Sequence, residues 1–303
     1  MKSGKLLWLA IAALGTTVLL CRPAPADEQA DSSVSDRQPR LPELTVTGPA
    51  LGEETLIGPN KQPEWTTARR FVRTRGYVLA PWQFSADLGY EVRRPGEDEE
   101  RHRLRQELEL GLPYRFQLDY EARGETESGG SEWDLASQSV ELRWALAEWG
   151  KIPTNPTLFA EWTFIRHEAD AYELKLLFTD ELAPRWHWGV NLFFEQQVGD
   201  HREREVAASG GLSYSVVDRR FGVGVESKLT SETANDEDGY HTFLQLGPSI
   251  QWRICPRVRL DVAPLFGIVH EAPLAELFVI LGFDFVPGSF ENEATEPASI
   301  RGR

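Results

Sequence analysis

Apolar and polar residues alternate along most of the chain from about residue 83 onward. In one segment Phe84, Ala86, Leu88 and Tyr90 share one face, while small or polar residues share the other. The same period of two recurs in runs that begin near residues 104, 116, 140, 158, 172, 186, 205, 221, 242, 257 and 275. Most of these runs approach the roughly 9 to 11 residues that a tilted strand needs to cross a bilayer. The pattern therefore predicts about twelve β-strands.

The last run, residues 275–285, places Leu281, Phe283 and Phe285 on one face and Glu276 and Asp284 on the other. A transmembrane barrel has hydrocarbon outside and water inside, so it suits strands with one apolar and one charged face. The terminal phenylalanine resembles the C-terminal insertion signal of Gram-negative outer-membrane β-barrels. The resemblance implies a location in the outer membrane and an assembly role for Phe283 and Phe285. It also implies outer-membrane lipid, lipopolysaccharide and the barrel assembly machinery as partners.

The connections between the predicted strands are of two kinds. Long polar ones span residues 94–103, 124–134, 198–204 and 231–241, and tight or proline-containing ones lie at 112–113, 182–185, 217–220 and 255–256. Outer-membrane barrels have short periplasmic turns and longer external loops, and we expect the two kinds to alternate strictly. The predicted fold is thus all-β, a membrane-spanning antiparallel up-and-down barrel of about twelve strands with a disordered N-terminal segment.

The N-terminal region divides into two predicted parts. Lys2 and Lys5 precede an apolar run at residues 6–20 and a small-x-small site at 24–26, so residues 1–26 are predicted to be a secretory signal peptide. Cys21 leaves open a lipoprotein alternative. Residues 27–75 are rich in Pro, Ser, Asp and Glu and are predicted to be a disordered periplasmic linker. The barrel is assigned to residues 76–286 and a short tail to 287–303.

Residues 41–48 in the predicted linker, LPELTVTG, resemble the TonB box of energy-coupled receptors. Such a β-prone strip could add a strand to the sheet of a partner. Those receptors need a plug domain and a barrel of about 22 strands, for which this chain is too short. A short β-prone patch within a linker is the alternative interpretation.

Composition narrows the class of protein. The formal net charge is −15, and removing the +3 of the signal segment leaves −18, which argues against a nucleic-acid partner. A mean hydropathy of −0.38 excludes a helical membrane protein but permits a barrel. A soluble sandwich or lipocalin-like barrel is an alternative, but it should bury its apolar faces in a core. Five tryptophans instead occupy the apolar strand faces, as in a membrane aromatic belt: Trp144, Trp162, Trp186, Trp188 and Trp252.

The polar strand faces would line the lumen and carry many charges. Inward charges can form an ion-pair network that fills the lumen, or a conduction path whose acidic excess favours cations or neutral polar solutes. Barrels of about 8 strands are filled and those of about 16 to 18 are open, so twelve lies between. The predicted lumen residues are Glu91, Arg93, Arg105, Glu107, Glu109, Arg115, Asp119, Glu121, Glu141, Arg143, Glu161, Glu173, Lys175, Glu195, Glu226, Lys228, Arg259, Asp261, Glu276 and Asp284.

Other chemistry has weaker support in the sequence. The six histidines are scattered without metal-ligand spacing, so neither a metal nor a cofactor is expected. A lipid hydrolase at the rim would need a nucleophile near a base, and the candidates are Ser139 or Ser213 with His167 or His187. No G-x-S-x-G motif surrounds either serine. Acidic runs at residues 97–100, 125–127, 232 and 236–238 are expected on external loops.

The leading functional hypothesis is a passive outer-membrane channel or small-solute transporter, with a small polar solute as a further partner. The barrel region loosely resembles a group of small uncharacterised bacterial barrels of a solute-exporter type. A structural or adhesion barrel with a plugged lumen is the second hypothesis. A rim lipid hydrolase is the third, and the chain is otherwise expected not to be an enzyme.

Overall fold

The computed structural model describes residues 51–67, 71–74, 76–96, 100–127, 133–199, 203–233, 239–269 and 272–285. The chain divides into two units, residues 1–49 and 50–303, and all described residues belong to the second. The predicted signal peptide, the TonB-box-like residues 41–48 and the tail at 287–303 lie outside the described residues. So do the acidic positions 97–99 and 236–238.

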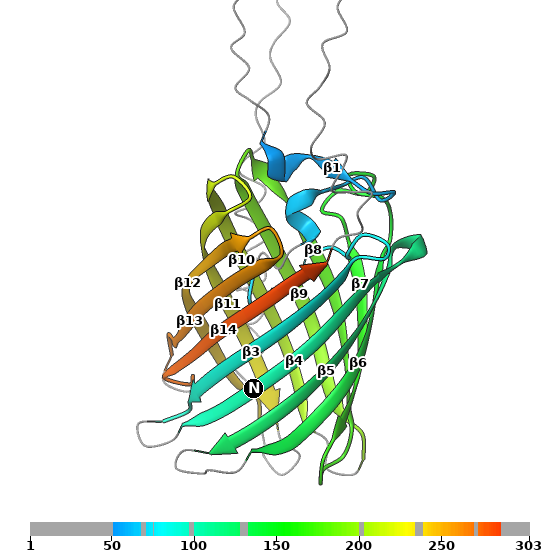
Figure 1. Ribbon diagram of the computed structural model, residues 1–303. Helices are drawn as coiled ribbons and strands as arrows, with labels where there is room; N and C mark the ends of the chain where they lie inside the picture. The colour runs from blue at the N-terminus through cyan, green and yellow to red at the C-terminus, as the bar shows by residue number, and fades with distance from the viewer. Residues whose placement is uncertain are drawn as a thin grey trace, which may run out of the picture. The chain divides into compact units, whose positions relative to one another are not determined.

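In the part of the chain that the structure describes, twelve strands form one closed barrel (Figure 1). Each strand pairs antiparallel with the next, and β14 pairs with β3 to close the ring. The predicted all-β up-and-down barrel is confirmed. The strands are β3 (Phe84–Arg94), β4 (Arg101–Leu112), β5 (Phe116–Glu127), β6 (Asp134–Ala145), β7 (Thr157–Ile165), β8 (Ala171–Ala183), β9 (Trp186–Gln197), β10 (Arg204–Val217), β11 (Phe221–Thr233), β12 (His241–Cys255), β13 (Val258–Gly267) and β14 (Ala275–Phe285).

Apolar side chains cover the outside of the barrel and charged ones fill its inside. Leu174, Val225 and Trp252 are about half exposed, whereas Glu107 and Glu226 are 2% and 1% exposed. An apolar core under a polar surface, as a soluble sandwich or lipocalin-like barrel would have, is therefore the wrong interpretation. The outward surface suits lipid. No helix among the described residues is long and apolar enough to cross a bilayer.

Connection lengths depart from the predicted strict alternation. The chain ends of β3 and β14 mark one end of the barrel, and the connection at 146–156 on that end is longer than the one at 166–170 on the other. The longer connection folds inward, since the Trp149 amide donates to the Asn60 carbonyl at 3.0 Å. It is therefore an interior contact and not a plain turn.

Residues before β3 are folded, so the predicted disordered linker is wrong for residues 51–67 and 71–74. They form η1 (Gly52–Glu54), β1 (Leu56–Ile57), β2 (Gln62–Pro63) and η2 (Glu64–Thr67), and the described residues between η2 and β3 form no helix or strand. Residues 76–83, which were assigned to the barrel, belong to this same segment. We call the described residues between 51 and 83 the plug. Figure 1 shows its first part across the barrel end at which β14 finishes.

Three more features of the strands agree with the sequence. The predicted starts of β7 to β13 fall within one residue of the observed starts. Trp144, Trp162, Trp186 and Trp252 are exposed on the outer surface. Phe285 also faces outward, and its ring lies 5.8 Å from that of Phe84 across the closing seam. The assembly role of Phe283 and Phe285 stays a prediction.

Candidate functional site

The plug is held in the barrel by buried hydrogen bonds to inward side chains. The Glu226 carboxylate of β11 accepts the backbone amides of Val72 at 2.9 Å and Arg73 at 2.8 Å. Gln117 of β5 accepts the Leu79 amide at 2.7 Å. Backbone groups that leave water need such partners, because an unmade bond costs about 1–3 kcal/mol. The lumen carboxylate predicted at Glu226 is thus a plug anchor.

The barrel wall is shaped to receive Phe71 of the plug. A Cβ at Gly211 of β10 would lie 2.4 Å from the Phe71 ring, and one at Gly189 of β9 would lie 3.2 Å from it. Phe71 itself is 1% exposed. Glycine within a strand often marks a close approach of this kind. The glycines within these strands are visible in the sequence, but the sequence does not indicate which group approaches them.

A second apolar contact lies where the plug meets the connection at 146–156. The Tyr77 ring packs edge-on against Trp149 at 5.4 Å, and its hydroxyl donates to the Ala147 carbonyl. Burial raises the pKa of Tyr77 from 10.0 to about 12, so the hydroxyl keeps its proton at neutral pH. Trp65 of η2 likewise contacts Trp149 at 5.5 Å.

Beyond the plug the lumen holds a cavity of about 360 Å³. Its floor includes Val72 and Arg73, and its walls come from eleven of the barrel strands, mostly through charged residues. A second cavity of about 400 Å³ lies at the opposite end, and Glu195, Glu205 and Glu232 line both. At the plug end the cavity described between η1, η2 and strands β10 to β13 is about 50 Å³. The described lumen is therefore widest away from the plug.

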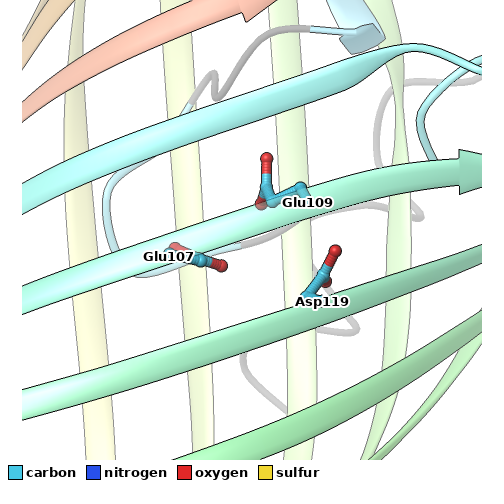
Figure 2. Close-up of side chains that lie close together, drawn as sticks. All are labelled: Glu107, Glu109 and Asp119. Atoms are coloured by element: carbon cyan, nitrogen blue, oxygen red, sulfur yellow. The ribbon is translucent and has the colours of Figure 1, made fainter.

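One arginine holds a group of buried carboxylates. Figure 2 shows Glu107, Glu109 and Asp119 on the neighbouring strands β4 and β5, with oxygen atoms within 4.8 Å of one another. Such a group could hold a cation. Here the Arg143 guanidinium lies 2.8 Å from Asp119 and 2.9 Å from Glu141, and within 3.9 Å of Glu107 and Glu109. Arg143 thus supplies the positive charge that a metal would.

A second arginine joins the strands at the closing seam. Arg259 of β13 lies 2.5 Å from Asp87 of β3, 2.5 Å from Asp261 and 3.3 Å from Asp284 of β14. A Cβ at Gly282 would lie 2.4 Å from the guanidinium, so a larger residue there would displace the Arg259 side chain. These residues link the first and last strands and do not line the large cavity.

The strand register places acidic residues directly opposite one another across eight consecutive strands, β4 to β11. Like charges in such pairs are destabilising, so cations must offset them. The row begins near the plug-side end of β4 and finishes near the far end of β11, and it therefore climbs around the wall. We call it the acidic row: Glu109, Asp119, Glu141, Glu161, Glu173, Glu195, Glu205 and Glu232.

A row of cations and aromatic rings lies one step closer to the plug. In register order it contains Arg143, Phe159, Lys175 and Phe193 on β6 to β9. The Lys175 ammonium lies 4.0 Å from the Phe159 ring centroid, and Lys228 lies 5.1 Å from that of Phe193. Ring faces attract cations, so this row stabilises the ammonium groups beneath the carboxylates.

The structure separates the predicted lumen residues into four groups. Arg115 is misassigned, because it is the last residue of η3 (Pro113–Arg115) between two strands, has φ 67° and donates to the Ala145 carbonyl. Arg259, Asp261 and Asp284 form the seam described above. Glu109, Asp119 and Glu226 lie deeper, near the plug. The large cavity is lined by Glu91, Arg93, Arg105, Glu107, Glu121, Glu141, Arg143, Glu161, Glu173, Lys175, Glu195, Lys228 and Glu276.

Sequence reasoning missed several cavity residues. Arg73 was assigned to the linker, and Glu232 was assigned to an external loop although β11 extends to Thr233. Glu125, another expected loop acid, lies on β5 and pairs with Arg103 at 2.6 Å. Inward phenylalanines were missed because apolar residues were assigned to the outer face. They are Phe159, Phe193, Phe243 and Phe278.

The candidate hydrolase residues do not lie at a lipid-facing rim. Ser139, Ser213 and His187 face the interior and are at most 3% exposed. Ser213 and His187 are opposite each other on β10 and β9, but the Trp65 ring of the plug lies 4.5 Å from His187. His167 lies in the connection at the other end of the barrel. A rim active site built from these residues is therefore wrong.

No protein-family model matches the sequence, and no curated protein matches it. Among solved structures, an outer membrane channel from Pseudomonas putida F1 is similar with a TM-score of 0.51 and 12% identity, over 69% of this chain and 97% of that chain. The NanC porin has a TM-score of 0.49 and 12% identity over 67% and 100% of the two chains. The KdgM porin has 0.46 and 10% over 67% and 99%. The likeness to the channel from Pseudomonas putida shows a shared fold.

Proposed function

We propose that the protein is a channel of the Gram-negative outer membrane that passes small polar solutes. The observation that carries the proposal is the charge-lined cavity of about 360 Å³, which shares wall residues with the cavity at the barrel end away from the plug. Charged walls around water are typical of conducting lumens. The fold shared with a solved outer membrane channel supports the proposal.

In this proposal the apolar outer surface lies in lipid, with lipopolysaccharide around the external end. The barrel assembly machinery would insert the chain, and the tryptophans on the outer surface would lie near the interfaces. Outer-membrane fractionation, together with gel migration that changes on heating, tests this location. A soluble periplasmic product would contradict it.

The plug is the constriction of the proposed channel. Its residues meet the wall through Glu226, Gln117 and the glycines beside Phe71. Solutes from the large cavity would have to pass these contacts to leave at the plug end. The plug therefore sets conductance in the proposal, and its loosening should widen the path.

The buried plug contacts also favour a second candidate, a structural barrel whose lumen stays closed. Single-channel recording of the refolded mature protein in planar bilayers separates the two. A channel gives discrete current steps, which become larger or longer when Glu226→Gln loosens the plug. A structural barrel gives none in the native protein. Absence of steps in both proteins would overturn the channel proposal.

A further inference from the structure

Most charged groups around the large cavity pair with one another. Arg103 lies 3.2 Å from Glu91, and Arg105 lies 3.6 Å from Glu121. On the acidic row, Lys175 pairs with Glu173 at 2.5 Å and Lys228 with Glu205 at 2.7 Å. Arg143 pairs with the carboxylates near the plug. These pairs neutralise much of the charge on the wall.

Two guanidinium groups on the cavity wall have no carboxylate oxygen within 4.0 Å among the described residues, and they act on Glu276 of the same wall only at longer range. Arg93 of β3 lines the cavity, and its Nε atom is buried without a hydrogen-bond partner. Arg73 of the plug lines the same cavity, and its guanidinium lies 4.8 Å from the Phe278 ring centroid on β14. Both groups therefore lie on the β14–β3 side.

Three carboxylates of the acidic row have no cation within 4.0 Å among the described groups, and Lys175, Arg93 and Lys228 act on them only at longer range. They are Glu161, Glu195 and Glu232, which alternate along the row with the lysine-paired Glu173 and Glu205. Glu161 accepts the Thr163 hydroxyl at 3.2 Å and is also hydrogen-bonded to Ser139 and Glu173. In the ring of twelve strands β9 is opposite β3, so Glu195 and Arg93 lie on opposite walls.

We propose that the cavity binds and passes zwitterionic solutes, which carry one ammonium and one carboxylate group, such as amino acids and short peptides. Charges in a confined lumen are costly unless water or a partner compensates them. A solute carboxylate can bind the guanidinium groups of Arg73 and Arg93, and its ammonium can reach Glu195 on the opposite wall. A volume of about 360 Å³ suits small solutes. This inference rests on the proposed channel function.

Solutes of a single charge fit the same wall less well. A cation would pair with Glu161, Glu195 or Glu232 but would be repelled by Arg73 and Arg93, and an anion would be repelled by the acidic row. Only a solute with both charges pairs with both sides at once. Separated charges of opposite sign also orient such a solute within the lumen.

The test uses the full mature protein in liposomes and four glycine-derived probes. Glycylglycine is zwitterionic, glycylglycinamide is a cation, N-acetylglycine is an anion and N-acetylglycinamide is neutral. We expect glycylglycine to enter several-fold faster than the other three. Equal rates, or rates ranked by one sign of charge, would overturn the inference. Planar-bilayer conductance is recorded in parallel, so absence of any conductance would overturn the channel proposal instead.

Substitutions on each wall test which residues bind the two charged groups of the solute. Arg93→Gln should lower entry of glycylglycine and of N-acetylglycine, because both use the carboxylate, and should leave the cation unaffected or faster. Glu195→Gln should lower entry of glycylglycine and of the cation. As controls, Arg166→Gln and Glu168→Gln remove the same charges from the exposed connection at 166–170. They should leave the entry rates of all four probes unchanged. Folding of the variants is verified by heat-modifiable migration. If both wall variants admit the four probes in the same order of rates as the native protein, Arg93 and Glu195 do not recognise the solute.

Discussion

Glu226 on β11 accepts the backbone amide of Val72 at 2.9 Å, although the two residues are 154 positions apart in the chain. The same carboxylate accepts the next amide, that of Arg73, at 2.8 Å. Two adjacent N–H groups on one carboxylate hold the plug backbone at a defined height in the lumen. The contact therefore links the size of the cavity to the position of the plug.

Replacing Glu226 by Gln should loosen the plug. The amide keeps one acceptor oxygen but places an NH₂ group against a backbone N–H, so we expect a loss of about 1.5–3 kcal/mol from the charged hydrogen bonds. Single-channel recording should show larger or longer openings than in the native protein. Ser227→Ala, on the outward face next to it, is the matched control. Identical currents in the native protein and the Glu226→Gln variant would contradict the anchor role.

Adding one methyl group to the wall beside Phe71 should displace the plug. A Cβ at Gly211 would lie 2.4 Å from the Phe71 ring, whereas one at Gly210 has its nearest atom at 3.6 Å. Gly211→Ala should therefore cost about 1–3 kcal/mol of stability and increase conductance, and Gly210→Ala should do neither. Melting curves and channel recordings on the pair check this. Equal behaviour of the two variants would show that Phe71 does not seat there.

Removing Arg143 should expose its carboxylate partners to one another. Arg143→Gln leaves buried acidic groups at Glu107, Glu109 and Asp119 without their main cation, and breaking such a network costs about 3–5 kcal/mol. We expect a lower melting temperature that Ca²⁺ partly restores, because the oxygens are close enough to share a cation. Arg166→Gln, an exposed pair, is the control. A melting temperature unaffected by the substitution would refute the structural role.

Alkaline pH should weaken the plug through Tyr77. The pKa of this phenol is 10.0 when unfolded and about 12 when folded, so its contribution is complete below pH 10 and is lost as pH rises toward 12. Tyr77→Phe removes the hydrogen bond to Ala147 and should flatten this part of the pH dependence. Thermal melting of the two proteins between pH 9 and about 12 provides the comparison. If the melting temperatures of the two proteins fall in parallel with pH, ionisation of Tyr77 does not cause the alkaline loss of stability.

Charge at the end of the last strand should impair assembly. Phe285 faces outward beside Phe84, so Phe285→Asp places a carboxylate against lipid and removes the terminal aromatic group. We expect several-fold less folded protein in the outer membrane, measured by heat-modifiable migration, and little change for Phe285→Leu. The prediction fails if the Asp variant accumulates like the native protein.

Alternation alone located the strands and the face that most of their residues occupy. Leu174 and Glu173 are adjacent in the chain, yet one faces outward and the other lines the cavity, as a period of two requires. Such facing is a local property of the backbone, so neighbouring residues determine it. The same reasoning failed for Phe159 and Phe193, because the inner wall accepts an aromatic ring where a lysine packs on it.

The plug could not be recognised from the sequence. Its chain is buried among glutamate, glutamine and serine side chains of the barrel, so burial there requires neither an apolar stretch nor a regular period. A polar segment that leaves water for a polar lumen has the composition of an exposed linker. Only the closed barrel around it shows that its backbone amides have buried partners.

The sequence by itself determined the all-β architecture, the approximate strand positions and the charged character of the inner wall. The tertiary structure alone decided which charges meet. Glu195 and Glu205 lie opposite each other because the connection between β9 and β10 sets the register, and Arg93 lies across from Glu195 because the ring closes between β14 and β3. Side-chain period is local, whereas register and closure depend on pairing between distant strands, and the lumen chemistry depends on both.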